Sequence, residues 1–164
     1  RMLLTKDGKE LVLFYGGESL KVPDTVEKID SYACYQLGNL SDVKLNDKLK
    51  EIGDYAFYHT GISTIKLKKN IQIIGEQAFA GNDIKTVKFN KKIKLIGKYC
   101  FDDNLLRKVY LRSNPRIEEG AFPKDAVIQY SKKAKNKGSV AELEYRVKTK
   151  KLYVVANKIK KYQL

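Results

Sequence analysis

The sequence predicts a repeat solenoid of α/β type, mainly β, because one short phrase returns along the chain at a fixed interval. "IGEQAFAG" from Ile74 returns as "IGDYAFYH" from Ile52, "IGKYCFDD" from Ile96 and a worn "IEEGAFPK" from Ile117. A catalytic motif is expected once, since one active site needs one set of groups. A phrase that recurs at regular spacing instead indicates repeated architecture.

Four apolar columns keep the same step over the repeated region. The Ala-Phe pairs, or their Cys-Phe equivalent, lie 22 residues apart, and the last follows after 21. The columns are Ile29, Ile52, Ile74, Ile96, Ile117; Leu40, Ile62, Ile84, Leu106; Val43, Ile65, Val87, Val109; and Leu45, Leu67, Phe89, Leu111. This regularity predicts a short right-handed solenoid of about five 22-residue units.

Each unit contains one candidate strand. The cores "LSDVKL", "ISTIKL", "IKTVKF" and "LRKVYL" follow the L-x-x-L-x-L pattern of leucine-rich repeats. Their second halves alternate with period two, as in a half-buried strand, so stacked units should form a parallel sheet on a concave face. The Ile before Gly and the Ala-Phe pair should close the core from the convex side. Gly53, Gly75 and Gly97 fall where we expect a tight bend.

The two ends of the chain differ from the repeats. Residues 3–16 are two apolar runs around an Asp7-Gly8 turn, which predicts an N-terminal β-hairpin, and the repeats begin near residue 20. Residues 1–130 are therefore expected to form the solenoid with its hairpin. Residues 131–164 are a basic C-terminal cap, a linker or the start of a following domain. Ser139 to Glu142 could cap a helix there, whereas "LEYRVKTKKLYVV" alternates like a hairpin.

The phrase I-G-x-x-A-F joined to L-x-x-V-x-L resembles the BspA-type leucine-rich repeat family of bacterial and protist surface proteins. The resemblance covers about residues 3–130, including the opening hairpin. It implies a non-catalytic binding protein at the bacterial cell surface or secreted, engaged in adhesion or host interaction. The fold alone does not fix the ligand.

The charge of the chain is concentrated near its C-terminus. The net charge is +14; residues 131–164 hold 11 Lys/Arg and 2 Asp/Glu, and the first 130 residues hold 22 and 17. The basic tail fits either a polyanion-binding arm or a solvated segment. No apolar run approaches the roughly 18 residues that span a bilayer, so we expect no membrane insertion. No signal peptide is recognisable, and the chain could be a piece of a larger protein.

Catalytic and metal-binding patterns are missing from the sequence. His59 is the only histidine available as the base of a nucleophilic triad, and no Gly-x-Ser-x-Gly elbow, phosphate-cradling loop or dinucleotide fingerprint occurs. The adjacent pairs Asp102-Asp103 and Glu118-Glu119 should diverge, which disfavours a glycosidase, and no calcium-loop spacing is present. We therefore expect that the protein is not an enzyme and that it binds no cofactor and no metal.

The two cysteines fit the repeat rather than a redox scheme. Cys34 fills the Phe column and Cys100 the Ala column, so both should be buried. They lie three rungs apart, which at about 4.8 Å per rung is roughly 14 Å, beyond the ~7 Å limit of a disulfide. We therefore predict two free thiols.

The concave face is the candidate ligand site. Outward positions in and beside the strands carry lysines stacked at strand spacing, which repel one another unless they splay into water or meet an anionic partner. The candidate ligand-binding residues are Lys44, Thr64, Lys66, Lys68, Thr86, Lys88, Asn90, Lys108, Tyr110 and Arg112. Nucleic acid is not expected, because Tyr32, Tyr55 and Tyr99 occupy equivalent repeat positions and no binding signature occurs.

Three functions remain open from the sequence. The first is a protein-binding adhesion module that uses the concave face. The second is a binder of polyanions, such as a cell-wall polymer or a sulfated glycan, through the lysines and the basic tail. The third is a passive spacer that displays a neighbouring domain. The oligomeric state is left open.

Overall fold

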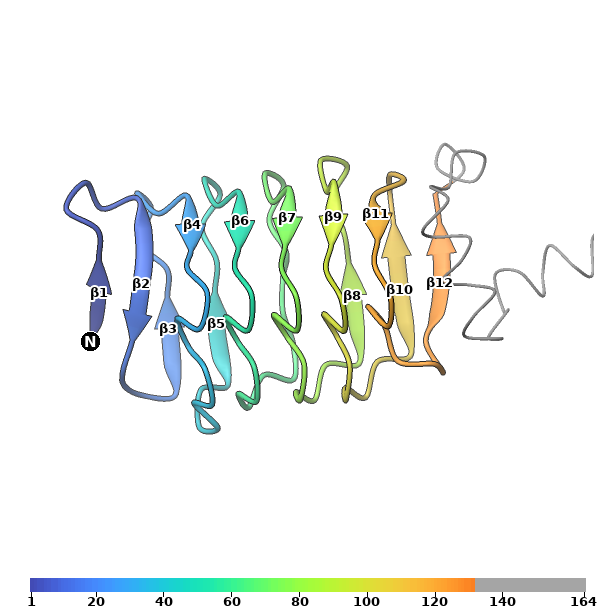
Figure 1. Ribbon diagram of the computed structural model, residues 1–164, viewed down its shortest axis with the longest axis horizontal. Helices are drawn as coiled ribbons and strands as arrows, with labels where there is room; N and C mark the ends of the chain where they lie inside the picture. Colours follow the sequence, from blue (N-terminus) through green and yellow to red (C-terminus); the bar gives the residue numbers. More distant parts are fainter. Residues whose placement is uncertain (132–164) are drawn as a thin grey trace, which may run out of the picture.

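The computed structural model of the chain describes residues 1–131, and these residues form strands, turns and no helix (Figure 1). The expected cap, linker or further domain, with its helix or hairpin, lies outside the described residues apart from Ser131. The strands are β1 (Met2–Leu4), β2 (Glu10–Phe14), β3 (Ser19–Lys21), β4 (Lys28–Ile29), β5 (Asp42–Lys44), β6 (Glu51–Ile52), β7 (Ile73–Ile74), β8 (Thr86–Lys88), β9 (Leu95–Ile96), β10 (Lys108–Leu111), β11 (Arg116–Ile117) and β12 (Val127–Tyr130).

Two parallel ladders run along the solenoid, so the predicted fold is confirmed (Figure 1). One ladder has the order β1-β2-β4-β6-β7-β9-β11, in which only β1 and β2 pair antiparallel. The other ladder contains three of the four predicted strands: β5 pairs with β3, and β8 and β10 form a sheet with β12, whereas the predicted strand in "ISTIKL" is not formed. The apolar columns lie in register, with Val87 beside Val109 and Val109 beside Ile128.

The solenoid has about six turns, because one further turn precedes the five predicted units. In this first turn β2, the second strand of the hairpin, pairs with β4, so that Leu11 lies beside Ile29. Leu20 of β3 lies beside Val43 in the same way. This first turn was missed because it contains no Ala-Phe phrase: Phe14 of β2 occupies the Phe position, and its N–H donates to the Ala33 carbonyl.

The glycine column has a different cause from the predicted tight bend. The Ile-Gly step is the end of a two-residue strand, and the three glycines do not have positive φ. A Cβ on Gly53 would lie 2.5 Å from the Ser31 nitrogen, and one on Gly97 would lie 2.5 Å from the Gly75 carbonyl carbon. Glycine is therefore needed because neighbouring turns approach too closely for a side chain.

A tightly turned segment follows each glycine and hydrogen-bonds to the next turn of the solenoid. The N–H groups of Tyr55, Phe57 and His59 donate forward to carbonyls of the following turn at 2.8–2.9 Å. The Gly75 N–H instead donates backward, to Ile52 at 2.9 Å. Four of these segments contain two positions with positive φ and the last contains one, a conformation that is uncommon outside glycine. These positions are Tyr32, Tyr55, Gln77, Tyr99 and Gly120, and then Gln36, His59, Gly81 and Asp103.

The core is a continuous apolar column with a stack of phenylalanines at its centre. Phe57 stacks on Phe79 at 5.2 Å between ring centroids, and Phe79 stacks on Phe101 at 5.3 Å; all three rings are fully buried. Cys34 and Cys100 are buried free thiols, as predicted. Burial raises the pKa of Cys34 to about 12 and raises that of Cys100 well above its ordinary value, so neither is a thiolate at neutral pH.

Candidate functional site

The strand face consists of the outward side chains of β3, β5, residues 64–66, β8, β10 and β12. Side chains of a strand alternate between its two faces, so the middle residue of each strand points into the core and its flanks point outward. The strand register extends the predicted column, which runs from Lys44 to Gln129, by one residue at its N-terminal end. The column is Lys21, Lys44, Lys66, Lys88, Tyr110 and Gln129. Lys21 was missed because the first turn was not recognised.

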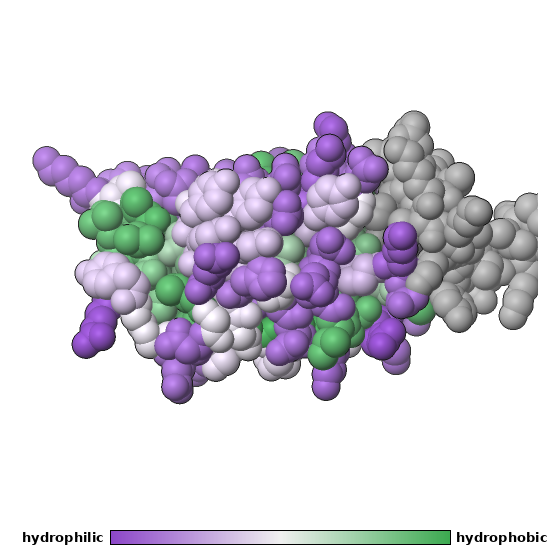
Figure 2. Space-filling model, turned by 60° about the horizontal axis from the view of Figure 1, so that its bottom comes forward, coloured by the Kyte–Doolittle hydropathy of each residue, from purple (hydrophilic) through white to green (hydrophobic). Residues whose placement is uncertain are grey.

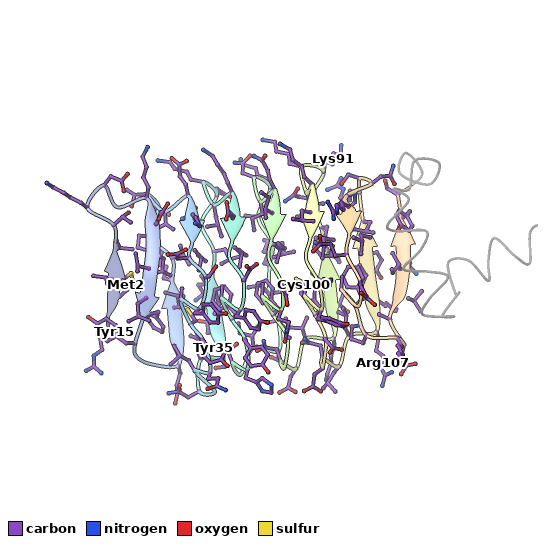
Figure 3. The ribbon with its side chains drawn as sticks, in the orientation of Figure 1. Met2, Tyr15, Tyr35, Lys91, Cys100 and Arg107 are labelled. Carbon is purple, nitrogen blue, oxygen red and sulfur yellow. The ribbon has the colours of Figure 1, made fainter. Side chains whose placement is uncertain are left out.

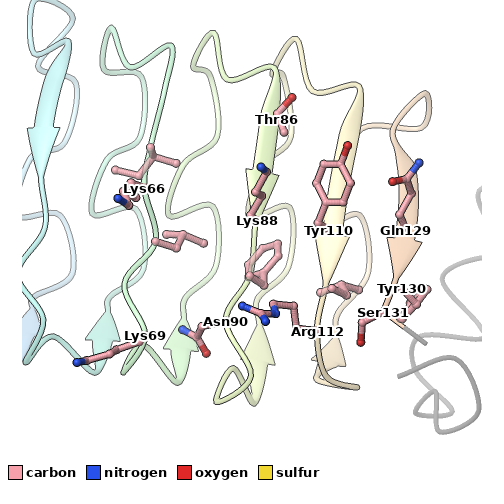
Figure 4. Close-up of a pocket in the computed structure, with 14 residues that line it drawn as sticks. Lys66, Lys69, Thr86, Lys88, Asn90, Tyr110, Arg112, Gln129, Tyr130 and Ser131 are labelled. Carbon is pink, nitrogen blue, oxygen red and sulfur yellow. The ribbon is translucent and has the colours of Figure 1, made fainter. Parts of the chain in front are cut away.

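A groove of about 820 Å³ lies on this face, between residues 65–69 and β12 (Figure 4). Ile65, Leu67, Phe89 and Leu111 supply its apolar lining. Its polar lining is Lys66, Lys69, Thr86, Lys88, Asn90, Tyr110, Arg112, Gln129, Tyr130 and Ser131. Four of these side chains are cationic and none is a carboxylate, so the groove favours anionic groups.

Six of the ten predicted residues line the groove. The other four do not; they are Lys44, Thr64, Lys68 and Lys108. Lys69, Tyr130 and Ser131 belong to the groove but were absent from the prediction. Lys69 stands one residue beyond the predicted column, in the loop after the strand, where a strand pattern carries no signal.

Two of the stacked lysines have partners that relieve their mutual repulsion. Lys44 pairs with Asp42 at 3.3 Å, and the Lys88 Nζ lies 5.5 Å from the centre of the Tyr110 ring. A cation over an aromatic face is attracted by the electron-rich ring. Lys66 and Lys69 have no ion-pair partner among residues 1–131. These two ammonium groups are therefore available to a ligand.

The predicted parallel sheet is interrupted in the middle of the strand face. Residues 64–66 are not part of a strand, and no backbone hydrogen bond among the described residues joins them to β5 or β8. The interruption falls at the rung of Lys66, which lies between Lys44 and Lys88. Lys44 also has lysines on both sides, but it pairs with Asp42 and its strand remains paired with β3, whereas Lys66 has no ion-pair partner among the described residues, so like charges oppose close pairing there. Beside it, Ile65 is 9% exposed whereas Val87 is 1% exposed. Ile65 and Lys66, which lie in the break, line one end of the groove.

Asn90 has a structural role in addition to lining the groove. Its Nδ2 donates to the Lys68 carbonyl at 2.7 Å and to the Ile71 carbonyl at 2.9 Å. Its Oδ1 accepts from the Lys92 N–H at 2.6 Å. Asn46, the equivalent residue two turns earlier, makes the same kind of contacts and is 5% exposed. The amide of Asn90 therefore shapes the loop beside the groove.

The remaining chemical candidates lie apart from the groove. His59 has φ 47°, and its ring packs beside Tyr58 at 4.4 Å and over Gly81. No cluster of three or more His, Cys, Asp or Glu suited to a metal ion occurs among residues 1–131. That part of the chain also contains no helix of the length and apolarity needed to cross a bilayer.

Comparison with known sequences identifies the repeat. The profile of the family described as "BspA type Leucine rich repeat region" matches residues 14–128 in six copies. The six copies agree with the six turns of the structure. A search of curated proteins found no significant match.

Solved structures of leucine-rich repeat proteins share the fold. The pneumococcal vaccine antigen PcpA is similar with a TM-score of 0.60 and 16% identity, over 90% of this chain and 44% of its own. The leucine-rich repeat protein of T. pallidum is similar with a TM-score of 0.56 and 20% identity, over 78% of this chain and 77% of its own. A leucine-rich repeat protein of Eubacterium ventriosum has a TM-score of 0.56 and 17% identity, over 80% of this chain and 42% of its own. The chain thus spans under half the length of two of these proteins.

Proposed function

The chain belongs to the BspA-type leucine-rich repeat family, and we propose that it is a non-catalytic binding module of a bacterial cell-surface or secreted protein. Its ligand in this proposal is a protein, bound on the strand face in an adhesion or host-interaction role. The family is one of bacterial surface proteins. A stacked solenoid presents a rigid surface, which loses little entropy on binding and suits an extended ligand.

The observation that carries the proposal is the groove. Leu67, which is half-buried, offers apolar surface that a protein side chain can cover, whereas Ile65, Phe89 and Leu111 are buried and contribute little exposed area. Tyr110 and Arg112 on its walls are of the residue types enriched at binding hot spots. The cationic rim would select a ligand segment that carries carboxylates beside its apolar anchors.

The test compares two charge-reversed proteins of equal net charge. Lys66→Glu/Lys88→Glu changes the groove, and Lys48→Glu/Lys91→Glu changes two exposed loop lysines that do not line it. Binding to a panel of immobilised host extracellular-matrix proteins is measured by surface plasmon resonance. We expect the groove variant to lose at least tenfold in affinity for any ligand found, while the loop variant retains it. Equal losses in both variants would exclude the groove as the site.

A second candidate function is binding of a polyanion such as a cell-wall polymer or a sulfated glycan. It is favoured by one observation, the four cationic side chains and no carboxylate in the groove lining. On a heparin column the groove variant should then elute at clearly lower salt than the loop variant, because binding driven by charge weakens steeply with ionic strength. Co-elution of the two variants would rule this candidate out. A passive spacer would bind neither class of ligand.

A further inference from the structure

A second surface of the molecule is built from four tyrosines that stack in pairs. Tyr32 stacks on Tyr55 with ring centroids 5.1 Å apart and planes 2° apart. Tyr35 stacks on Tyr58 at 5.2 Å and 9°. The two pairs meet edge to face, at 5.5 Å between Tyr32 and Tyr35 and 5.6 Å between Tyr55 and Tyr58. The result is one aromatic cluster rather than scattered rings.

The cluster is exposed, and Tyr35 lies on the opposite side of the solenoid from the loop that contains Lys91. Tyr32 is 52% exposed and Tyr35 is 39% exposed. Tyr35 lies toward the lower edge in Figure 3, whereas Lys91 lies at the upper edge. Figure 2, which brings the lower side forward, shows a pale patch over the first turns beside the green apolar surface of the hairpin end.

The exposed tyrosines suit a polypeptide partner. Within each stacked pair the two rings cover one face of each other, which holds both rings in a fixed orientation. Tyrosine is typical of protein interfaces, where one side chain supplies both apolar contact and hydrogen bonding.

Acidic side chains gather in the turned segments that carry the tyrosines. The five segments that follow the Ile columns hold nine Asp/Glu and two Lys, a net charge of −7. The rest of residues 1–130 hold 20 Lys/Arg and 8 Asp/Glu, a net charge of +12. These segments are residues 30–37, 53–61, 75–83, 97–105 and 118–125. The solenoid therefore has an acidic edge although the whole chain is strongly basic.

Three carboxylates of this edge, in segments 53–61, 75–83 and 97–105, have no ion-pair partner among the described residues. Asp54, Glu76 and Asp102 take part in none of the six ion pairs among the described residues. Asp54 and Asp102 are exposed. We call the four tyrosines with these three carboxylates the turn edge.

Hydrogen bonds hold part of the turn edge in place. The Tyr55 hydroxyl donates to the Glu76 carboxylate at 3.2 Å and accepts from the Gln77 side-chain amide at 2.8 Å. Burial, and then the adjacent Glu76, raise the pKa of Tyr55, so its hydroxyl remains a donor at neutral pH. An ordered surface loses less entropy when a partner binds.

We propose that the turn edge is a docking surface for a cationic polypeptide segment, rich in Lys and Arg, of another protein. The aliphatic stems of such side chains pack against tyrosine edges while their charged ends reach the unpaired carboxylates. The strand face favours the opposite charge, so the two surfaces would select different partners.

The test uses the full chain and a fluorescein-labelled oligolysine in fluorescence polarisation at low salt. The edge variant is Asp54→Asn/Glu76→Gln, which keeps oxygen acceptors for the Glu76 N–H and the Tyr55 hydroxyl. The control is Asp24→Asn/Asp47→Asn, two exposed carboxylates elsewhere with the same change in net charge. We expect the edge variant to bind about fivefold more weakly, as for the loss of two charge pairs at the surface, and the control to bind like the parent.

The contribution of the aromatic rings is tested at Tyr35. Tyr35→Ala should weaken oligolysine binding severalfold, while Tyr35→Phe, which keeps the ring, should retain it. Equal affinity of the edge variant and its control, or no binding by the parent chain, would overturn the proposal. So would sedimentation data in which the free parent chain self-associates and only the edge variant is monomeric, since the edge would then hold a second copy.

Discussion

The phenylalanines in the core and the tyrosines on the turn edge are placed by the same turned segment, and they stack alike. Phe57 and Phe79 lie 5.2 Å and 9° apart, and Tyr35 and Tyr58 lie 5.2 Å and 9° apart. The phenylalanines are fully buried, whereas Tyr35 is 39% exposed. Stacking is thus a consequence of rung spacing for any aromatic pair on neighbouring turns. What distinguishes a surface is where the sequence places such pairs.

The two columns also differ in how far they continue. The phenylalanine stack continues through Phe101 to Phe122, whereas after Tyr58 the tyrosine position is taken by Ala80 and then Asp102. Every turn must fill the core, so the inner column tolerates little change. The outer column is free of that requirement. A patch confined to the first turns is therefore a feature of this sequence rather than of the repeat.

The largest expected effect is at the centre of the inner column. Phe79→Ala should reduce the free energy of unfolding by about 3–5 kcal/mol, because it leaves a cavity between two stacked rings. Urea denaturation followed by circular dichroism measures the loss. Phe79→Leu serves as the milder control. A loss below that of a surface substitution would mean that the stack does not support the core.

A smaller loss is expected where neighbouring turns touch. A Cβ at Gly75 would lie 2.7 Å from the Asp54 nitrogen and 2.9 Å from the Gly53 carbonyl carbon. Gly75→Ala should therefore cost about 1–3 kcal/mol in the same denaturation experiment, since backbone has to move. Gly38→Ala is the matched control, because nothing lies within 4 Å of its added Cβ. Similar stabilities of the two variants would contradict the close-approach explanation.

Substitutions in the exposed tyrosine stack should reduce the free energy of unfolding less than substitutions in the phenylalanine stack. Tyr58→Ala removes one stacked contact and two edge contacts, and aromatic pairs of this kind contribute about 0.5–1.5 kcal/mol each. A double-mutant cycle with Tyr35→Ala isolates the energy of the stacked pair. A coupling energy as large as the loss of stability caused by Phe79→Ala would contradict the expectation that the exposed stack contributes less to stability than the buried one.

The smallest expected effect has the opposite sign. Lys66→Thr removes the central charge of the lysine column and should raise the free energy of unfolding by about 0.5 kcal/mol. Hydrogen exchange at residues 64–66 should slow as the strand pairs with its neighbours. Lys91→Thr, in an exposed loop, should leave both quantities unchanged. Unchanged exchange at residues 64–66 would show that charge repulsion does not cause the break.

Much of the fold could be predicted because the core repeats itself in the sequence. The columns through Val43 and Ile52 predicted the register of both ladders, and the Asp7-Gly8 turn predicted the hairpin. The first turn could not be found, because Phe14 and Leu11 lie in the hairpin strand without the repeated phrase. The two-residue strands were also missed, since two residues are too short to display an alternation.

The candidate site was less accessible from the sequence. The outward lysines and Tyr110 could be placed by counting residues, but the broken pairing at residues 64–66, beside the groove, could not be predicted. No pattern in "ISTIKL" distinguishes it from its neighbours. Tyr32 and Tyr55 were interpreted as repeat architecture, which describes their position. Their stacking, and the second pair beside them, required the three-dimensional structure.

The two directions of hydrogen bonding along the axis bear on how such a molecule can change in length. Amides of the turned segments, such as Phe57, donate toward the C-terminal end, while those of the glycine column, such as Gly75, donate toward the N-terminal end. Their peptide dipoles oppose one another, unlike the aligned dipoles of an α-helix. Gaining or losing a turn during evolution therefore builds up little electric field at the ends of the solenoid.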